Sequence, residues 1–275
     1  MTKNIRVLFI SQEITPYLPE TEISIISRYL PQATQERGRE IRTFMPKYSC
    51  INERRNQLHE VIRLSGMNLI IDDTDHPLII KVASIQAARM QVYFIDNEDY
   101  FPRKSSFGDC SEEAADFLNF DNNEERSIFF IRGVLETVRK LRWTPDIVHC
   151  HGWLTALAPL YIKKAYNDEP SFRNAKIVYS LYENVFDKPF DKSFSEKLLL
   201  NGIKKEHLKS ISKVIDCEAL NKLAIDFSDG VVQGSTIVNN VLWEYAHKAK
   251  KLLLPYQDSE NYINAYNDFY DKITK

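Results

Sequence analysis

The sequence predicts an α/β fold in which a mostly parallel β-sheet carries helices on both faces. Two observations carry this prediction. Short β-rich runs alternate with helical patterns along much of the chain, an order typical of parallel sheets with crossover helices. In addition, 44% of the 275 residues are hydrophobic and 27% are charged, the balance of a globular chain that buries a sizeable core.

The individual elements follow from hydrophobic periodicity and from turn residues. The first strand, residues 5–10, opens a β-loop-α-β unit, and Gly38 is placed to end its helix. Residues 59–95 hold several β-rich runs around a turn expected at Asp73 to Pro77, which indicates a small antiparallel hairpin insert. The other expected strands are 41–45, 146–150, 176–181 and 230–233, and the expected helices are 22–37, 123–141, 153–166, parts of 193–226, 235–250 and 258–275.

Composition excludes several classes of protein. Only 8 glycines are present, against about 19 at the average usage of ~7%, and their spacing matches neither the G-x-G-x-x-G fingerprint nor the P-loop. The net charge of -2 supplies no basic field for nucleic acid. No apolar stretch approaches the ~20 residues of a membrane span. Four widely spaced cysteines and the absence of a signal peptide pattern predict a reducing, cytoplasmic location.

Candidate site residues follow the predicted strands, because ligands of such sheets bind beyond the carboxyl ends of parallel strands. Trp153 offers an apolar face on which a sugar can stack, while other side chains offer hydrogen bonds. An equally weighted alternative is that His151 and Trp153 only pack the strand-to-helix turn. The candidates for sugar or glucan binding are Glu13, His151, Trp153, Thr155, Tyr182, Glu183 and Asn184.

His149 and His151 form an H-x-H pair whose side chains are expected on one face of a strand. Two histidines fall short of the three or four ligands of a closed metal site. No third ligand follows at an obvious spacing, and Cys150 is expected on the opposite face. We therefore expect no metal site and no metal cofactor.

Four stretches, read together, resemble the N-terminal half of bacterial glycogen synthases and plant starch synthases. The run VLFISQEITPY at Val7–Tyr17 is similar to the family's V-L-F-V-S-S-E-x-x-P-x. REIRTFMPKY at Arg39–Tyr48 and QVYFIDNEDYFPR at Gln91–Arg103 resemble two further family stretches. The most specific match is WTPDIVHCHGWLTALAPLYIK at Trp143–Lys163, beside the family's P-D-I-V-H-x-H-D-W-H-T-A-L-x-P.

The resemblance implies one Rossmann-like lobe of a GT-B glycosyltransferase, an enzyme with two such lobes around a cleft. It implies an N-terminal-type domain over residues 1–254 and a C-terminal helix packed on it over 255–275, with the second GT-B domain absent. The family activity is transfer of glucose from ADP-glucose to an α-1,4-glucan. A cofactor beyond that donor is not expected.

The sequence departs from the family where the donor would bind. The family's K-T-G-G loop is replaced by Tyr17 to Glu22, which removes a cation and adds acids. In the H-D-W-H-T motif, the aspartate is Gly152 and the second histidine is Leu154. The family's T-I-H-N becomes Ser180-Leu181-Tyr182-Glu183. These changes predict that the chain is catalytically impaired by itself.

Two further readings of function stay open. One is a non-catalytic module that binds an α-glucan or a protein of glycogen metabolism. The other is a homodimer in which a second copy covers the face that the second lobe covers in the family, because large apolar patches rarely stay exposed in monomers. Neither reading involves nucleic acid or a membrane.

Overall fold

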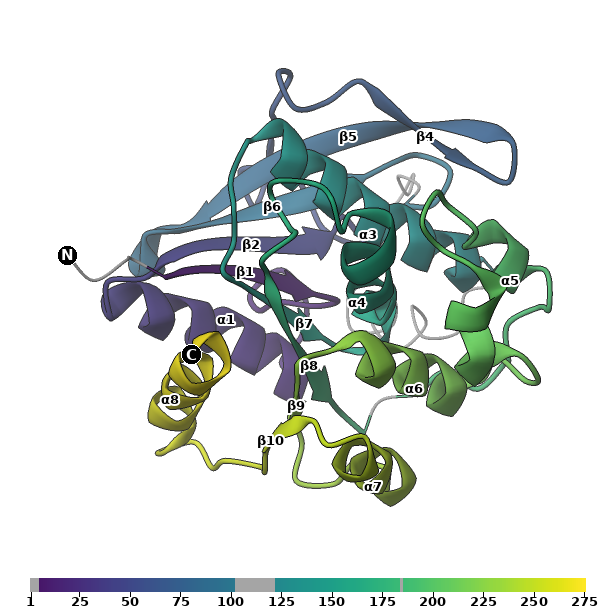
Figure 1. Cartoon of the computed structure of the whole chain (residues 1–275). Helices are drawn as coiled ribbons and strands as arrows, with labels where there is room; N and C mark the ends of the chain where they lie inside the picture. Colours follow the sequence, from purple (N-terminus) through teal and green to yellow (C-terminus); the bar gives the residue numbers. More distant parts are fainter. Residues whose placement is uncertain (1–4, 102–121, 184) are drawn as a thin grey trace.

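The computed structural model describes residues 5–101, 122–183 and 185–275. Its strands belong to one mixed sheet with the order β10-β9-β8-β7-β1-β2-β6-β5-β3, and β4 pairs only with β5. Neighbouring strands from β10 to β6 are parallel, and β5 is antiparallel to its partners. The predicted fold class is therefore confirmed (Figure 1). The strands are β1 Arg6–Ser11, β2 Glu40–Pro46, β3 His59–Glu60, β4 Met67–Ile71, β5 Thr74–Ile85, β6 Met90–Asp96, β7 Ile147–His151, β8 Lys176–Leu181, β9 Gly230–Gln233 and β10 Leu252–Leu254.

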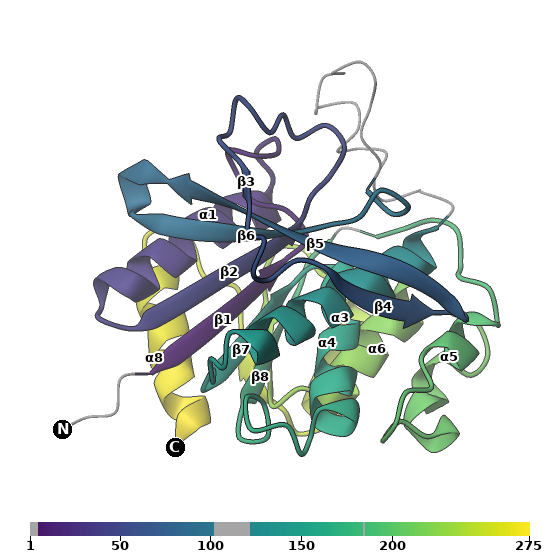
Figure 2. The ribbon, with the colours of Figure 1, turned by 90° about the horizontal axis from the view of Figure 1, so that it is seen from above.

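The helices lie on both faces of the sheet, as Figure 2 shows from above. Helices α1 and α8 cover one face, and α3, α4 and α6 cover the other. The α-helices are α1 Glu22–Glu36, α3 Asn123–Lys140, α4 Leu157–Leu160, α5 Phe194–Lys197, α6 Cys217–Phe227, α7 Asn240–Lys248 and α8 Tyr262–Thr274. Short 3-10 helices span η1 Gln86–Ala88, η3 Trp153–Thr155 and η5 Lys205–Ile211, and η4 Tyr161–Ala165 is a π-helix.

Capping residues in the local sequence determine where helix α1 begins and ends. Thr21 and Ser24 form a capping box, in which each side chain accepts the other's backbone N–H. Gly38 follows the C-cap with φ +83, the left-handed conformation that glycine adopts without strain. The position of Gly38 after the helix is thus confirmed.

Helix α8 packs against the sheet beside α1, although it comes last in the chain. Its Tyr266, Phe269, Tyr270 and Ile273 are buried against residues of β1, β7, β8 and β9. Arg39 ties it to the start of β2 through an ion pair with Asp271 of 2.9 Å. The aromatic residues of α8, which recur at helical spacing, thus form its buried face.

Local structure differs from the prediction at several places, among them the expected helix 153–166, which the structure divides into η3, α4 and η4. The hairpin turn lies at Asp72 and Asp73, with φ of +50 and +61, because aspartate tolerates the left-handed region that a two-residue turn requires. Helix α7 begins at residue 240, where Asn239 caps it, rather than at 235. Strand β10 was not predicted, because three residues give too short a pattern.

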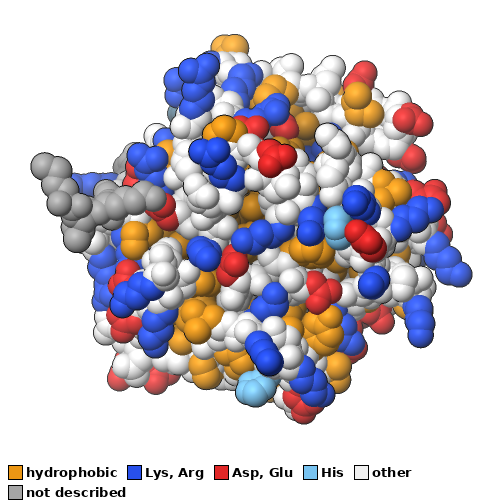
Figure 3. All heavy atoms as spheres, viewed as in Figure 1, with side chains coloured by type: hydrophobic (Ala, Val, Ile, Leu, Met, Phe, Trp, Pro, Cys, Tyr) orange, Lys and Arg blue, Asp and Glu red, His pale blue; other side chains and the backbone are white. Residues whose placement is uncertain are grey.

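The described helices include none with the length and apolar character needed to cross a membrane. On the face drawn in Figure 3, basic and acidic side chains alternate with small hydrophobic patches. This mixture agrees with the small net charge of the chain.

Candidate functional site

The candidate residues lie where β1, β7 and β8 end. The register places Ser11 opposite His151, and His151 opposite Ser180, so the three carboxyl ends meet at one edge of the sheet. The Gln12 backbone N–H continues the pairing by donating to the carbonyl of His151 over 3.2 Å.

His151 is completely buried at this edge. The distance from its Nδ1 to the Tyr182 hydroxyl is 2.7 Å, and its ring stacks on Phe9 with centroids 6.3 Å apart. Burial lowers the pKa of His151 to about 3, so the imidazole is neutral at physiological pH. Its Nε2 is enclosed and has no hydrogen-bond partner among the residues that the structure describes. A ligand can reach this nitrogen only after neighbouring groups move.

His149 lies beside His151, as the H-x-H pattern predicts, with ring centroids 3.9 Å apart. Its Nδ1 is 2.6 Å from the Tyr270 hydroxyl of α8, and its Nε2 is 2.8 Å from the Ser180 hydroxyl. Both nitrogens are therefore engaged in hydrogen bonds. Desolvation by burial, with the nearby His151, lowers the pKa of His149 well below its usual range.

Glu13 is also buried, with 3% of its surface exposed. Desolvation raises the pKa of its carboxyl, although hydrogen bonds from Thr21 and Gln12 oppose this rise. The distance from Gln12 Nε2 to Glu13 Oε1 is 3.3 Å. Glu13 is thus held inside the protein by its own loop rather than presented to solvent.

Gln12 fills the space beside Gly152. Gly152 has φ +87, and a Cβ atom at this position would lie 2.2 Å from Gln12 Oε1. That oxygen accepts a hydrogen bond of 3.4 Å from the backbone N–H of Leu154. A side chain at residue 152 and the present conformation of Gln12 therefore exclude each other.

Trp153 and Thr155 point into the opposite layer of the molecule. Trp153 is 1% exposed, and its ring packs edge-on against Phe186 and Phe190. The Thr155 hydroxyl donates to the Gly152 carbonyl over 2.7 Å. In this conformation both side chains support the turn after β7, and no face of the indole is open to a sugar.

The remaining candidates follow β8. Tyr182 is 8% exposed, and its ring fills the space that a side chain at Gly234 would need. Glu183 is exposed, and its backbone N–H donates to the Ser235 hydroxyl over 3.4 Å. Asn184 lies outside the described residues. The structure therefore brings Glu13, His151 and Tyr182 to one edge, with Glu183 at the surface nearby.

Sequence reasoning missed two features of this edge. One is Gln12, which stands where the family motif has serine but is not among the predicted site residues. The other is the network of His149, Ser180 and Tyr270, which joins residues as much as 121 positions apart. The available signals for this network were the H-x-H pair and the helical spacing of Tyr266 and Tyr270 in the expected helix 258–275. Among the described residues, no cluster of three or more His, Cys, Asp or Glu side chains is arranged to hold a metal ion.

In an open α/β sheet, ligands bind beyond the carboxyl ends of the parallel strands, and these polar groups lie at that edge. The family model described as starch synthase catalytic domain matches residues 6–252. The chain therefore belongs to that family, in agreement with the resemblance of its motifs.

Individual relatives agree with this assignment. The glycogen synthase of Chlorobium luteolum is 38% identical over 182 residues, which cover 66% of this chain and 36% of that protein. The glycogen synthase of Chlorobaculum parvum is 33% identical over 210 residues, which cover 74% of this chain and 42% of that protein. The alignments thus span well under half the length of these curated relatives.

A solved structure shows the same fold. The catalytic domain of starch synthase IV from Arabidopsis thaliana, bound to ADP and acarbose, superposes with a TM-score of 0.71 at 18% identity. The match covers 93% of this chain and 52% of that domain. The GT-B lobe expected from the motifs is therefore confirmed as a fold.

Proposed function

We propose that this chain supplies one lobe of a glycogen or starch synthase-like glucosyltransferase and does not transfer glucose by itself. In the whole reaction, with ADP-glucose as donor, this lobe would contact the transferred sugar and the α-1,4-glucan. The observation that carries this proposal is the loop between β1 and α1, which is built without the features that hold a diphosphate.

The loop between β1 and α1 is packed and acidic. Tyr17 and Leu18 are 5% and 4% exposed, so the loop is anchored in the core. Glu20 and Glu22 are exposed around the start of α1, where their charges complement the helix dipole in place of an external anion. Thr21 already accepts the N–H of Ser24. A diphosphate at this helix end would meet two carboxylates and fewer free N–H groups.

The sugar side of the site would be formed by Glu13, His151 and Tyr182. A neutral imidazole and a phenol are suitable hydrogen-bond partners for sugar hydroxyls. Since His151 Nε2 is enclosed, sugar binding would require Tyr182 or the turn after Gly152 to move. Trp153 and Thr155 would act by supporting that turn, and Glu183 by offering a carboxylate at the surface.

The test is isothermal titration of the chain with ADP-glucose and, separately, with maltooligosaccharides. We expect heat of binding from the maltooligosaccharides and none from ADP-glucose in the micromolar range. Incorporation of labelled glucose into glycogen by the 275-residue chain alone would contradict the proposal. Conservative variants such as H151Q and Y182F should weaken glucan binding, whereas K272E on α8 serves as a surface control.

A second candidate function is a non-catalytic module for an α-glucan or for a protein of glycogen metabolism. The joint departure of Gly152, Leu154 and Tyr182 from the family motifs favours it, because catalysis of glycosyl transfer from a diphosphate depends on positioned charge. Addition of a relative's nucleotide-binding lobe separates the two candidates. Restored glucose transfer supports the first candidate, one lobe of a glucosyltransferase. Glucan binding without any transfer supports the second candidate, a non-catalytic module.

We also propose a reducing, cytoplasmic location and consider a homodimer. Among the residues that the structure describes, Cys150 and Cys217 are buried and form no disulfide, as expected in a reducing compartment. Ile25 and Tyr29 of α1 are 40% and 47% exposed, which gives a second copy apolar side chains to cover. Size-exclusion chromatography at micromolar concentration tests the dimer, and elution as a 32.1 kDa monomer would exclude it.

A further inference from the structure

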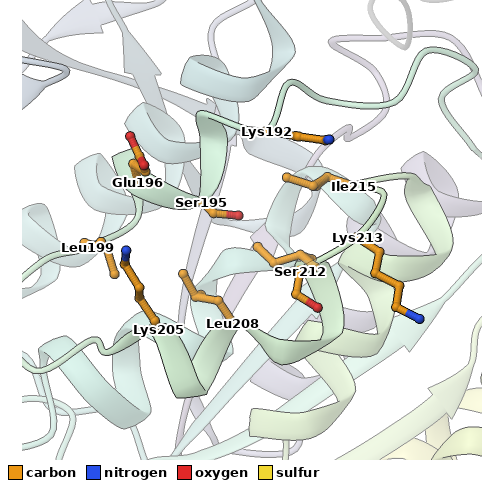
Figure 4. A pocket seen from close by; sticks show the side chains of 10 residues that line it. Lys192, Ser195, Glu196, Leu199, Lys205, Leu208, Ser212, Lys213 and Ile215 are labelled. Atoms are coloured by element: carbon orange, nitrogen blue, oxygen red, sulfur yellow. The ribbon is translucent and has the colours of Figure 1, made fainter.

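A cavity of about 250 Å³ lies beyond α5, away from the residues of the candidate site. Three consecutive segments enclose it: the start and end of α5, the 3-10 helix η5, and residues 212–215 (Figure 4). Its lining residues are Lys192, Ser195, Glu196, Leu199, Lys205, Leu208, Ile211, Ser212, Lys213 and Ile215. None of these ten residues is aromatic, so the cavity lacks the flat surfaces on which sugars stack.

The inner part of the cavity is apolar. Leu208, Ile211 and Ile215 are at most 4% exposed and belong to the core, while Leu199 is 39% exposed at the edge. The Ser195 hydroxyl points toward the middle of the cavity in Figure 4 and makes no hydrogen bond within the described chain. An apolar ligand would therefore gain hydrophobic contact and find one free hydroxyl donor.

Lysines surround this apolar interior. Lys192 and Lys205 stand on opposite sides of the cavity, and Lys213 extends outward from it (Figure 4). Within the described part of the chain, none of the three forms an ion pair, whereas Lys47, Lys81, Lys163, Lys197, Lys222 and Lys248 each do. With Glu196 as the only acidic lining residue, the cavity carries an excess of positive charge.

We propose that this cavity binds a small amphiphilic anion, with an apolar body against Leu208 and Ile215 and a carboxylate or phosphate group at the lysine edge. A bare inorganic ion would leave the leucine and isoleucine surfaces uncovered, so we expect it to bind more weakly than an amphiphilic anion. A neutral apolar molecule would make no ion pair with the lysines, so we expect it to bind more weakly as well. Long-range attraction by the lysines adds to the rate of association.

The experiment is a fluorescence titration with 1-anilinonaphthalene-8-sulfonate, followed by displacement with octanoate, octyl phosphate and octanol. We expect octanoate or octyl phosphate to displace the dye and octanol to do so at least about fivefold less well. The variants K192E and K205E should each raise the dissociation constant about two- to fivefold, as expected for the loss of exposed charge pairs. Displacement by only one of the two anions identifies the preferred head group.

Two further variants keep the result interpretable. S195F places a ring in the cavity and should abolish displaceable dye binding, while circular dichroism reports that the variant is folded. K209E changes a charge on the same short helix at an exposed residue that does not line the cavity. Equal affinity of wild type, K192E and K205E, or an equal loss in K209E, would overturn the proposal. Octanol displacing the dye as well as octanoate would also overturn it.

Discussion

The two faces of the sheet are packed with different chemistry. The face under α3, α4 and α6 buries mainly large apolar side chains, including Phe129, Phe130 and Tyr161, with separate polar contacts such as the hydrogen bond from Tyr179 to Asn221. The face under α1 and α8 buries a chain of polar groups that includes His149, Ser180 and Tyr270. Alternation along β7 explains the difference, because Cys150 points to the first face and the two histidines to the second.

The first face supplies the framework of the fold, and the second carries the buried polar groups next to the candidate site. An apolar layer contributes stability in proportion to the surface it buries. A buried polar layer contributes little net stability but requires each group to find a partner. We therefore expect substitutions on the apolar face to reduce stability most, and substitutions on the polar face to change pH dependence and binding.

The largest expected effect is on the apolar face. F129A removes a completely buried ring and should lower the free energy of unfolding by about 3–5 kcal/mol. Urea denaturation followed by circular dichroism measures this change. Y29A, at a half-exposed position on α1, is the control and should cost under about 1 kcal/mol. A loss below about 1 kcal/mol in F129A would mean that this layer is not the main source of stability.

Substitution of Gly152, at the carboxyl edge of the sheet, should lower the free energy of unfolding nearly as much. G152D combines a left-handed backbone with a clash against Gln12 and should cost roughly 3 kcal/mol. Residues 12 and 152 both depart from the family motifs, which have serine and aspartate there. The double variant Q12S/G152D should therefore recover about 1 kcal/mol or more, since neighbouring substitutions couple. Strictly additive losses in a double-mutant cycle would show that the two positions are independent.

The polar face should make stability depend on pH. Burial holds the pKa of His151 at about 3 in the folded state, whereas an unfolded histidine titrates near ~6.5. The unfolded chain therefore takes up the proton first as the pH falls. The contribution of neutral His151 is complete above the unfolded pKa and is lost between roughly pH 6 and 3, by up to about 1.4 kcal/mol per pH unit.

The measurement is the free energy of unfolding in urea at several pH values between 7 and 4. The variant H151Q removes the titrating group while keeping a polar side chain for Tyr182. The free energy of unfolding of H151Q should fall less steeply with decreasing pH than that of the wild type. The difference in slope should correspond to the uptake of about one proton fewer on unfolding. Parallel pH profiles for the two proteins would contradict the neutral, desolvated state of His151.

Sequence alone predicted the parts of this architecture that depend on local pattern. The strand ends, Gly38 after α1 and the shared face of His149 and His151 follow from periodicity and backbone preference. The pairing of His149 with Tyr270 does not, because 121 residues separate them and no local rule places α8 over β7. Likewise Trp153 is recognised by its motif, but its burial against Phe186 depends on tertiary packing.

The smallest and most direct comparison removes one hydroxyl from each face. Tyr270 shares a hydrogen bond of 2.6 Å with His149, so Y270F leaves a buried nitrogen unpaired and should cost about 1–2 kcal/mol. The Tyr161 hydroxyl on the opposite face is buried, and no described residue forms a hydrogen bond with it. Y161F removes that unsatisfied group and should be neutral or slightly stabilising. Both variants delete one oxygen atom from a fully buried tyrosine, so their difference in free energy of unfolding isolates the polar network. Equal effects of the two substitutions would mean that the hydrogen bonds under α8 do not distinguish the two faces energetically.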